Sequence, residues 1–243
     1  MALRTQKTIA TFGLMTLLAG SCLAEEFTFA ARHRHLRKGE TGEIKITDSS
    51  ISFREGGKHA DHSREWKYED IQQLWLGPYS LRILTYEDIR WKLGQDREYE
   101  FDGLPEKLSA RVYSMLRNRM DQRFVAAMAD SSFSPLWRGK AKHLTALGGS
   151  NGVVLISSNA IVYEADAPGS SRTWRLQDIE NVSTTGPFDL TISTFEREGS
   201  NYGSHRTFRF QLKEALPERT YNELWRRLNP AHLSEQKENH PNE

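Results

Sequence analysis

Cysteine is almost absent from this chain, and neither sign of charge predominates. The 243 residues include a single cysteine, Cys22, so neither a disulfide framework nor a cysteine-based metal site is expected. Lys and Arg number 33 against 32 Asp and Glu, whereas dedicated nucleic-acid-binding proteins usually carry a basic excess. Nucleic acid is therefore not among the expected partners.

Long apolar runs are lacking too, apart from one at the N-terminus that has the order of an export signal. Arg4 and Lys7 precede the mostly apolar residues 8–18, and small residues follow before Glu25. This is the pattern of a secretory signal, and the run is shorter than the roughly 20 apolar residues that span a bilayer. We therefore expect residues 1–24 to be a signal peptide and the mature protein to be exported without a transmembrane span.

Cys22 leaves two interpretations of this signal open. The segment 19–22 (Ala-Gly-Ser-Cys) resembles a bacterial lipobox, although that family prefers leucine where Ala19 stands. In this case residues 1–21 are the signal and Cys22 becomes the lipidated first residue of an envelope-anchored lipoprotein. The alternative is cleavage after Ala24, which discards Cys22 and gives a periplasmic or secreted protein.

The remainder of the chain carries the same landmarks twice, in the same order. We expect a first domain at residues 27–129, a linker at 130–136, a second domain at 137–230 and a disordered tail at 231–243. The matched pairs of landmarks are Gly42 with Gly152, Trp66 with Trp174, Asp70 with Asp178, Pro78 with Pro187, and Pro105 with Pro217.

Alternating apolar and polar side chains predict strands at matching places in the two copies. The alternation begins with Tyr79 in the first copy and with Phe188 in the second, which predicts that both aromatic side chains face inward. Each copy then ends in an amphipathic helix that starts at a Leu-Pro-Glu sequence. In the first copy the apolar pattern extends this helix through residues 124–128. The clearest strand segments are residues 79–85, 98–102, 188–194 and 207–212.

Seven or so short strands closed by one C-terminal helix resemble the plan of the pleckstrin-homology (PH) superfold. The resemblance is carried by Gly42, by Ser-Arg-x-Trp-x-x-x-Asp-Ile at 63–71 and 171–179, and by the Leu-Pro-Glu helix starts. Together these features resemble bacterial PH-like and GRAM-like domains in tandem. The resemblance implies a mainly β, α+β fold of two tandem barrels, each of about seven antiparallel strands closed by one helix. It also implies binding of phospholipid head groups, peptides or proteins rather than catalysis.

Some recurring residues have a structural interpretation. Trp66 and Trp174 stand at the same strand position in both copies and are expected in the core, because aromatic side chains dominate core energetics. An arginine and an aspartate recur beside each tryptophan and are expected to form a structural ion pair. These pairs are Arg64 with Asp70 and Arg172 with Asp178.

The best candidate for a binding site is a basic segment that follows the first predicted strand. Its permanent charges have few counterparts at residues 142–149 of the second copy. In PH-like domains the loop between the first two strands often holds a lipid or phosphate, so we expect this segment to bind an anionic lipid surface, with about 1 kcal/mol from each basic residue. The alternative is a solvated basic edge. The four candidate residues are Arg32, Arg34, Arg37 and Lys38.

No catalytic residue, metal site or cofactor is predicted. Two histidine clusters, His33-x-His35 and His59-x-x-His62 with Asp61, are present, but zinc needs three or four converging ligands and nothing in the sequence brings the clusters together. The nucleophile elbow, the His-Glu-x-x-His motif and the Walker loop are absent from the sequence. The expected function is therefore a non-catalytic binding or scaffolding module at the cell envelope, with a protein or an anionic lipid as partner. The alternative is an enzyme-like or metal-binding domain whose site the sequence does not reveal.

The two copies also differ in ways that bear on how they associate. Residues 98–102 present an acidic outward face, whereas residues 207–213 present a neutral to basic one. Leu84 and Trp91 have no apolar counterparts in the second copy. We expect these two side chains to seal the domains against each other, and the alternative is that they bind a partner.

Overall fold

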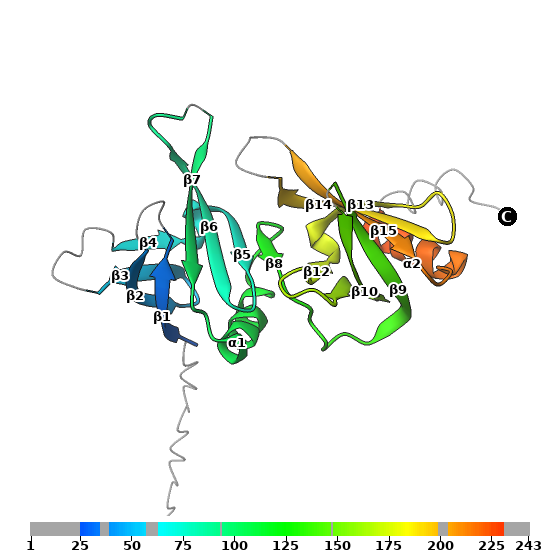
Figure 1. Ribbon diagram of the computed structural model, residues 1–243, viewed down its shortest axis with the longest axis horizontal. Helices are drawn as coiled ribbons and strands as arrows, with labels where there is room; N and C mark the ends of the chain where they lie inside the picture. Colours follow the sequence, from blue (N-terminus) through cyan, green and yellow to red (C-terminus); the bar gives the residue numbers. More distant parts are fainter. Residues whose placement is uncertain are drawn as a thin grey trace, which may run out of the picture.

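The computed structural model is mainly β, with two helices. It describes residues 25–34, 39–56, 63–92, 94–146, 148–198 and 204–230. The described strands all belong to one continuous hydrogen-bonded sheet of 15 strands, which Figure 1 shows as two groups joined at β8. No helix among the described residues is long and apolar enough to cross a membrane.

The first repeat contains seven strands and the helix α1. Its strands are hydrogen-bonded in the order β4-β3-β2-β1-β7-β6-β5. The helix follows directly on the last strand, as the Leu-Pro-Glu sequence predicts. The elements are β1 (Phe27–His33), β2 (Glu40–Ile46), β3 (Ser50–Glu55), β4 (Arg64–Lys67), β5 (Ile71–Leu76), β6 (Ser80–Asp88), β7 (Asp96–Asp102) and α1 (Glu106–Leu116).

The second repeat has the same number of strands in the same order. Its strands are arranged as β12-β11-β10-β9-β15-β14-β13, so each strand has a counterpart in the first repeat. β9 begins at Pro135, inside the segment that was expected to be linker. The elements are β9 (Pro135–Thr145), β10 (Gly148–Ser157), β11 (Ala160–Ala165), β12 (Arg172–Arg175), β13 (Ile179–Ser183), β14 (Asp189–Arg197), β15 (His205–Leu212) and α2 (Glu218–Leu228).

Backbone pairing joins the two halves of each repeat at one corner. β1 pairs with β7, and β9 pairs with β15. At the opposite corner of each repeat the two end strands are not neighbours in the described sheet. These end strands are β4 and β5 in the first repeat and β12 and β13 in the second. The mainly β class with two helices is thus confirmed, whereas closure into two separate barrels is not seen in the backbone pairing of the described residues.

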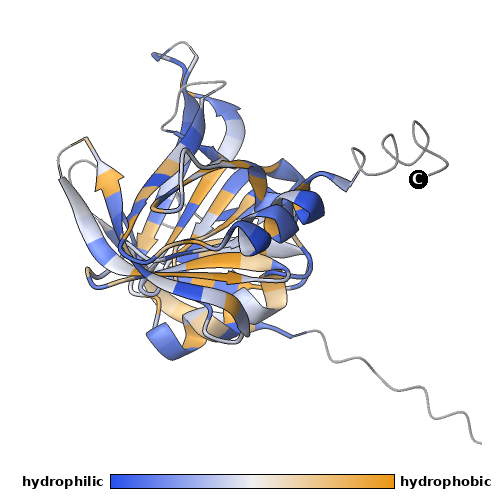
Figure 2. Cartoon of the chain, turned by 90° about the vertical axis from the view of Figure 1, so that its right-hand side faces the viewer, coloured by the Kyte–Doolittle hydropathy of each residue, from blue (hydrophilic) through white to orange (hydrophobic). Residues whose placement is uncertain are grey.

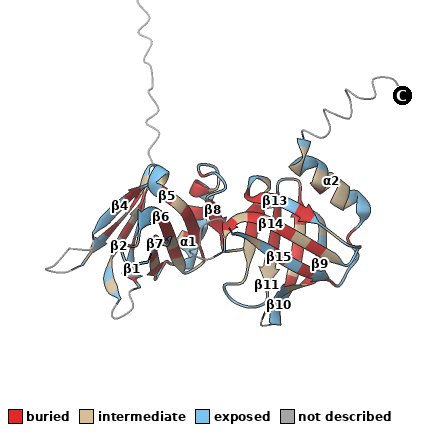
Figure 3. Ribbon diagram, turned by 90° about the horizontal axis from the view of Figure 1, so that it is seen from above, coloured by how far each residue is buried: buried red, intermediate tan, exposed pale blue. Residues whose placement is uncertain are grey.

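The core of each repeat is built around its recurring tryptophan. Trp66 and Trp174 are both buried, as the sequence predicts. The Trp66 ring centroid lies 4.9 Å from that of Tyr99, and the Trp174 centroid lies 4.8 Å from that of Phe208. In Figure 3 the buried residues follow the strands of both groups, and Figure 2 shows apolar and polar residues alternating along these strands.

Gly42 and Gly152 recur because an aromatic ring packs directly over each of them. A Cβ atom on Gly42 would lie 2.6 Å from the ring of Phe53, and one on Gly152 would lie 2.8 Å from the ring of Tyr163. Real Cβ atoms do not approach other heavy atoms so closely. The close approach of backbone to ring therefore requires glycine at this point in both repeats.

Two local predictions are wrong. Tyr79 and Phe188 are exposed rather than inward-facing, because each lies in the turn before its strand and β6 and β14 begin one residue later. The helix α1 ends at Leu116 and does not continue through residues 124–128. Instead, β8 (Phe124–Ala126) is a strand that pairs in parallel with β5 and contacts β12 at one residue pair.

Candidate binding surfaces

The predicted basic segment is only partly among the described residues. Arg32 and Arg34 are exposed at the end of β1, whereas Arg37, Lys38 and Cys22 lie outside the described residues. The Arg34 guanidinium contacts Glu100 at 3.1 Å and Asp102 at 2.6 Å. The acidic face of β7 therefore balances part of this charge, and the anionic-surface site stays a prediction.

His33, which lies within this segment, faces inward. His33 is buried, and its ring stacks on Phe101 at a centroid distance of 4.9 Å with Phe53 and Tyr99 nearby. His35, His59, Asp61 and His62 lie outside the described residues. Within the described ranges, no group of three or more His, Cys, Asp or Glu side chains converges.

The recurring arginines do not pair with the aspartates that the sequence suggested. In the second repeat the Nε of Arg172 lies 3.6 Å from the Glu196 carboxylate. Asp178 instead holds Arg175 at 2.6 Å. Arg206 contacts the other carboxylate oxygen of Glu196 at 3.0 Å, so the carboxylate is shared by two arginines.

The first repeat contains the same arrangement. Glu87 lies 3.8 Å from Arg64 and 3.3 Å from Arg97, and it also accepts a hydrogen bond of 3.3 Å from the hydroxyl of Tyr99. We call the two groups the Arg–Glu–Arg clusters. The first consists of Arg64, Glu87 and Arg97, and the second consists of Arg172, Glu196 and Arg206.

The two clusters differ in what covers them. The side chain of Glu196 is 2% exposed, whereas that of Glu87 is 47% exposed. The cover over Glu196 comes from the first repeat, because the indole N–H of Trp75 donates a 3.2 Å hydrogen bond to its carboxylate. The Arg82 guanidinium lies 3.8 Å above the Trp75 ring and completes this contact.

The second cluster borders a polar concavity of about 400 Å³, which we call the cationic pocket. Two guanidinium groups face one carboxylate there, so the pocket has a net positive charge while its histidine is neutral. Burial lowers the pKa of His143, and the nearby charges of Arg206 and Arg172 lower it further. The pocket is lined by His143, Thr145, Gly149, Ser150, Ala167, Gly169, Ser170, Arg172, Arg206 and Phe208.

The sequence did not identify this pocket as a binding site. The sequence favours the basic segment of the first copy, because the matching loop at residues 142–149 lacks most of that charge. The charge comes instead from β12 and β15, which deliver Arg172 and Arg206 from distant parts of the chain. The recurrence of an arginine two residues before each core tryptophan was the available signal.

The two repeats meet along β8. The side-chain amide of Gln73 donates to the Phe195 carbonyl at 3.0 Å and accepts from the Arg197 amide at 2.7 Å, in the manner of a neighbouring strand. Leu84 is buried against Trp75 and Val125, which border this junction, and its sealing role stays a prediction. Trp91 is 82% exposed, so its expected sealing role is wrong.

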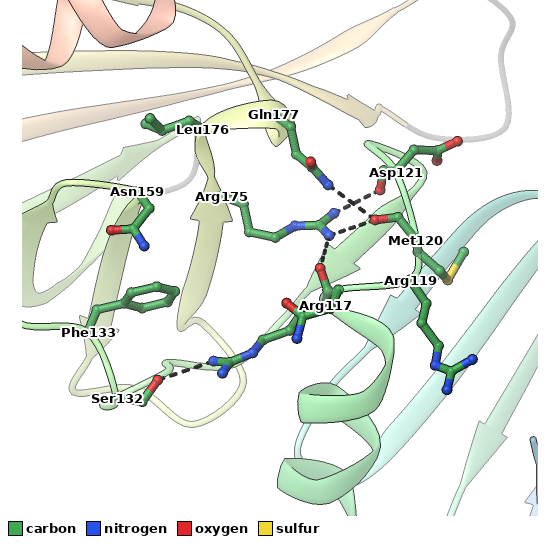
Figure 4. Close-up of a pocket in the computed structure, with 11 residues that line it drawn as sticks. Arg117, Arg119, Met120, Asp121, Ser132, Phe133, Asn159, Arg175, Leu176 and Gln177 are labelled. Atoms are coloured by element: carbon green, nitrogen blue, oxygen red, sulfur yellow. Dashed lines mark hydrogen bonds between the residues drawn. The ribbon is translucent and has the colours of Figure 1, made fainter. Parts of the chain in front are cut away.

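A wide hollow of about 870 Å³ lies beside this junction (Figure 4). Arg175 reaches across it and donates hydrogen bonds to the carbonyls of Arg117, Met120 and Asp121. Arg117 in turn holds Asp130 at 2.9 Å. These guanidinium groups are engaged in holding the repeats together, so we assign the hollow to the junction.

Comparison with known proteins gives distant structural likenesses. No family model and no curated protein matches the chain. It is similar to the N-terminal PH domain of human ARAP2 (15% identity, 39% of this chain and 77% of that one, TM-score 0.30). It is also similar to the C-terminal domain of an unknown protein from Leishmania infantum (8%, 51% and 96%, 0.31) and to the Spt16D–Pob3N heterodimer (10%, 81% and 99%, 0.31). At these values the likenesses carry no argument of their own.

Proposed function

We propose that the chain is a non-catalytic binding protein of the cell envelope, which holds the anionic head group of an envelope lipid in the cationic pocket. The proposal includes export through the N-terminal signal and a PH-like character for both repeats. The single observation that carries it is the convergence of Arg172, Arg206 and His143 on one open concavity of about 400 Å³.

The chemistry of the pocket suits a phosphate better than a neutral ligand. The side chain of Arg206 is 41% exposed. Some of its guanidinium N–H groups can therefore donate to a ligand while another contacts Glu196. Thr145, Ser150 and Ser170 add hydroxyl donors around the same concavity. A bound anion also favours protonation of His143, so binding should strengthen as the pH falls into the range in which this histidine takes up a proton.

Vesicle flotation with the mature chain tests the proposal. We expect binding to vesicles that contain phosphatidylglycerol and none to vesicles of phosphatidylcholine alone. Arg206→Gln should weaken binding about fivefold, as expected for loss of about 1 kcal/mol at an anionic surface. Arg97→Gln alters the matched residue of the first repeat and should leave binding unchanged.

A second variant guards against structural damage from the loss of Arg206. Ser170→Glu places a negative charge at the rim of the pocket, where the side chain has no internal role among the described contacts, and should weaken binding to a similar extent. Replacement of Arg34, Arg37 and Lys38 by serine tests the basic segment separately. The proposal fails if the wild-type chain ignores anionic vesicles, or if both pocket variants bind as the wild type does.

A further inference from the structure

Among the described residues, the strand β8 covers one open edge of each repeat, and no strand covers the other edge of either repeat. It lies between β5 of the first repeat and β12 of the second. β4 and β13 are consequently the two ends of the described sheet. An uncovered strand edge presents backbone N–H and C=O groups that can pair with another chain.

A groove runs beside β12. It is filled by residues 122–130, which contain β8 and which we call the connecting segment. Only about 10 Å³ of free space remains there. Ala126 of β8 pairs with Thr173, and the Thr173 hydroxyl bonds both the Met128 carbonyl and the Asp130 amide at 2.8 Å. The second repeat contributes Thr173, Trp174, Asp178, Thr194 and Glu196 to the groove, and the connecting segment contributes Gln122, Phe124 and Val125.

The same groove is open in the first repeat. The strand registers establish the equivalence, because Trp66 pairs with Ile51 as Trp174 pairs with Ile161. Here the free space amounts to about 270 Å³. We call this site the open groove, and it is lined by Glu65, Trp66, Asp70, Thr85, Tyr86 and Glu87.

We propose that the open groove is a docking site for an extended segment of a partner protein, which adds a strand to β4 as β8 adds one to β12. Strand addition at a sheet edge takes its affinity from main-chain hydrogen bonds and its specificity from side-chain pockets. The junction supplies the model for the occupant. In the filled groove Phe124 and Val125 line the same space as the core residue Trp174. Beside them, Trp75 of β5 donates its indole N–H to the Glu196 carboxylate at 3.2 Å.

The charge of the open groove defines the partner further. Glu65 stands where the second repeat has Thr173, and Asp70 stands where it has Asp178. Arg175 neutralises Asp178 in the second repeat at 2.6 Å. At its position the first repeat has Lys67, which faces Glu69 at 3.6 Å. The open groove is therefore the more acidic of the two, and it suits a segment with an apolar or aromatic residue next to a lysine or arginine.

The other available occupants fit less well. Residues 231–243 contain no aromatic residue and carry three glutamates against one lysine, so their charge opposes that of the open groove. Residues 1–24 carry the apolar run expected to be removed on export. In a second copy of the chain, β8 is already engaged at its own junction. A separate protein is thus the occupant that the charge and the geometry favour.

The sharpest probe is the natural occupant of the filled groove, supplied as a peptide. A synthetic peptide of residues 119–130 is titrated into the isotope-labelled mature chain, and backbone amide shifts are followed by NMR. We expect shifts confined to β4 and to the end of β6 around Glu87. Replacement of Phe124 and Val125 by aspartate in the peptide should abolish them, and Arg123→Glu in the peptide should weaken binding at least threefold.

Two variants of the chain locate the binding site. Glu65→Arg reverses a charge on the open groove and should weaken peptide binding at least fivefold. Glu180→Arg makes the same change on β13, the other uncovered edge, and should have no effect. Both glutamates are exposed, so neither change is expected to unfold the chain.

Several outcomes would overturn the proposal. These are the absence of shifts at millimolar peptide, shifts centred on Thr173 that report displacement of β8, and equal effects of the two variants. Self-association of the chain that Glu65→Arg abolishes would make a second copy the occupant instead. None of these readouts depends on lipid, so this test and the vesicle test fail independently.

Discussion

The two repeats hold the same Arg–Glu–Arg cluster in two different environments. In the second repeat the carboxylate is buried beneath the first repeat, and in the first repeat it lies close to solvent. Charges interact several times more strongly where water is excluded, and an isolated charge is correspondingly costly there. The same three residue types therefore act as a structural joint in one repeat and as an accessible surface in the other.

The contact between the repeats also has a direction. The first repeat contributes an apolar outer face with Trp75 and Leu84, and the second contributes the end of β14. At the matching positions of its own outer face the second repeat has Ser183 and Ser193. A head-to-tail contact can propagate into a filament. Because this face of the second repeat is polar, it does not offer the apolar contact that would add a third repeat in the same way. The β4 end of the first repeat therefore suits a different partner.

Removal of the indole at the junction should have the largest effect. Trp75→Ala leaves a cavity beside Leu84 and removes the hydrogen bond to buried Glu196, which should cost about 3–5 kcal/mol. We expect calorimetry to resolve two unfolding transitions in place of one, because the repeats lose their main contact. Trp91→Ala, on an exposed side chain, should change the unfolding free energy by less than about 0.5 kcal/mol. A single transition at an unchanged midpoint would contradict the assigned role of Trp75.

Neutralising the two cluster carboxylates compares the repeats directly. Glu196→Gln leaves Arg172 buried without a counter-charge and should lower the unfolding free energy by about 3 kcal/mol. Glu87→Gln makes the same change near solvent and should cost about 0–1 kcal/mol. Urea unfolding of both variants measures the difference. Equal losses would show that the cover supplied by the first repeat has no energetic importance.

Much of the fold could be predicted because each local sequence pattern that determines a strand, a helix start or a core position occurs in both repeats. Trp66 and Trp174, the helix starts and the alternating strands depend on local pattern, and all recur in the same order with only small slips in their spacing. The strand β8 could not be predicted in this way. Its short apolar sequence is compatible with either helix or strand, and its conformation is decided by pairing with β5 and β12, which are distant in sequence.

The candidate site was less accessible to sequence reasoning. The recurrence of an arginine and an aspartate in both copies suggests that Arg172 pairs with Asp178, whereas the fold brings Glu196 to Arg172. An alignment of the repeats places Glu87 opposite Glu196 and could have indicated the shared carboxylate. No local pattern indicates that one of these clusters lies under the other repeat, because that depends on the junction.

The smallest effect concerns the protonation of His143. Burial and the charges of Arg206 and Arg172 hold its pKa below the ordinary value near 6.5. Above that pH the residue is neutral in both folded and unfolded chains. As the pH falls below about 6.5, the unfolded chain takes up a proton that the folded chain resists, so the free energy of unfolding decreases. His143→Gln should remove this part of the pH dependence.

Removing one of the two charges near His143 tests the cause of this shift. Arg206→Gln should move the pKa of His143 upward, because one of the positive charges that oppose its protonation is lost. Arg97→Gln removes the matched charge of the first repeat and should leave that pKa unchanged. An NMR titration of the His143 ring measures both. If the ring titrates at or above 6.5 in the wild-type chain, then the pocket is less cationic than its arginines imply, and the contrast between the repeats lies in burial alone.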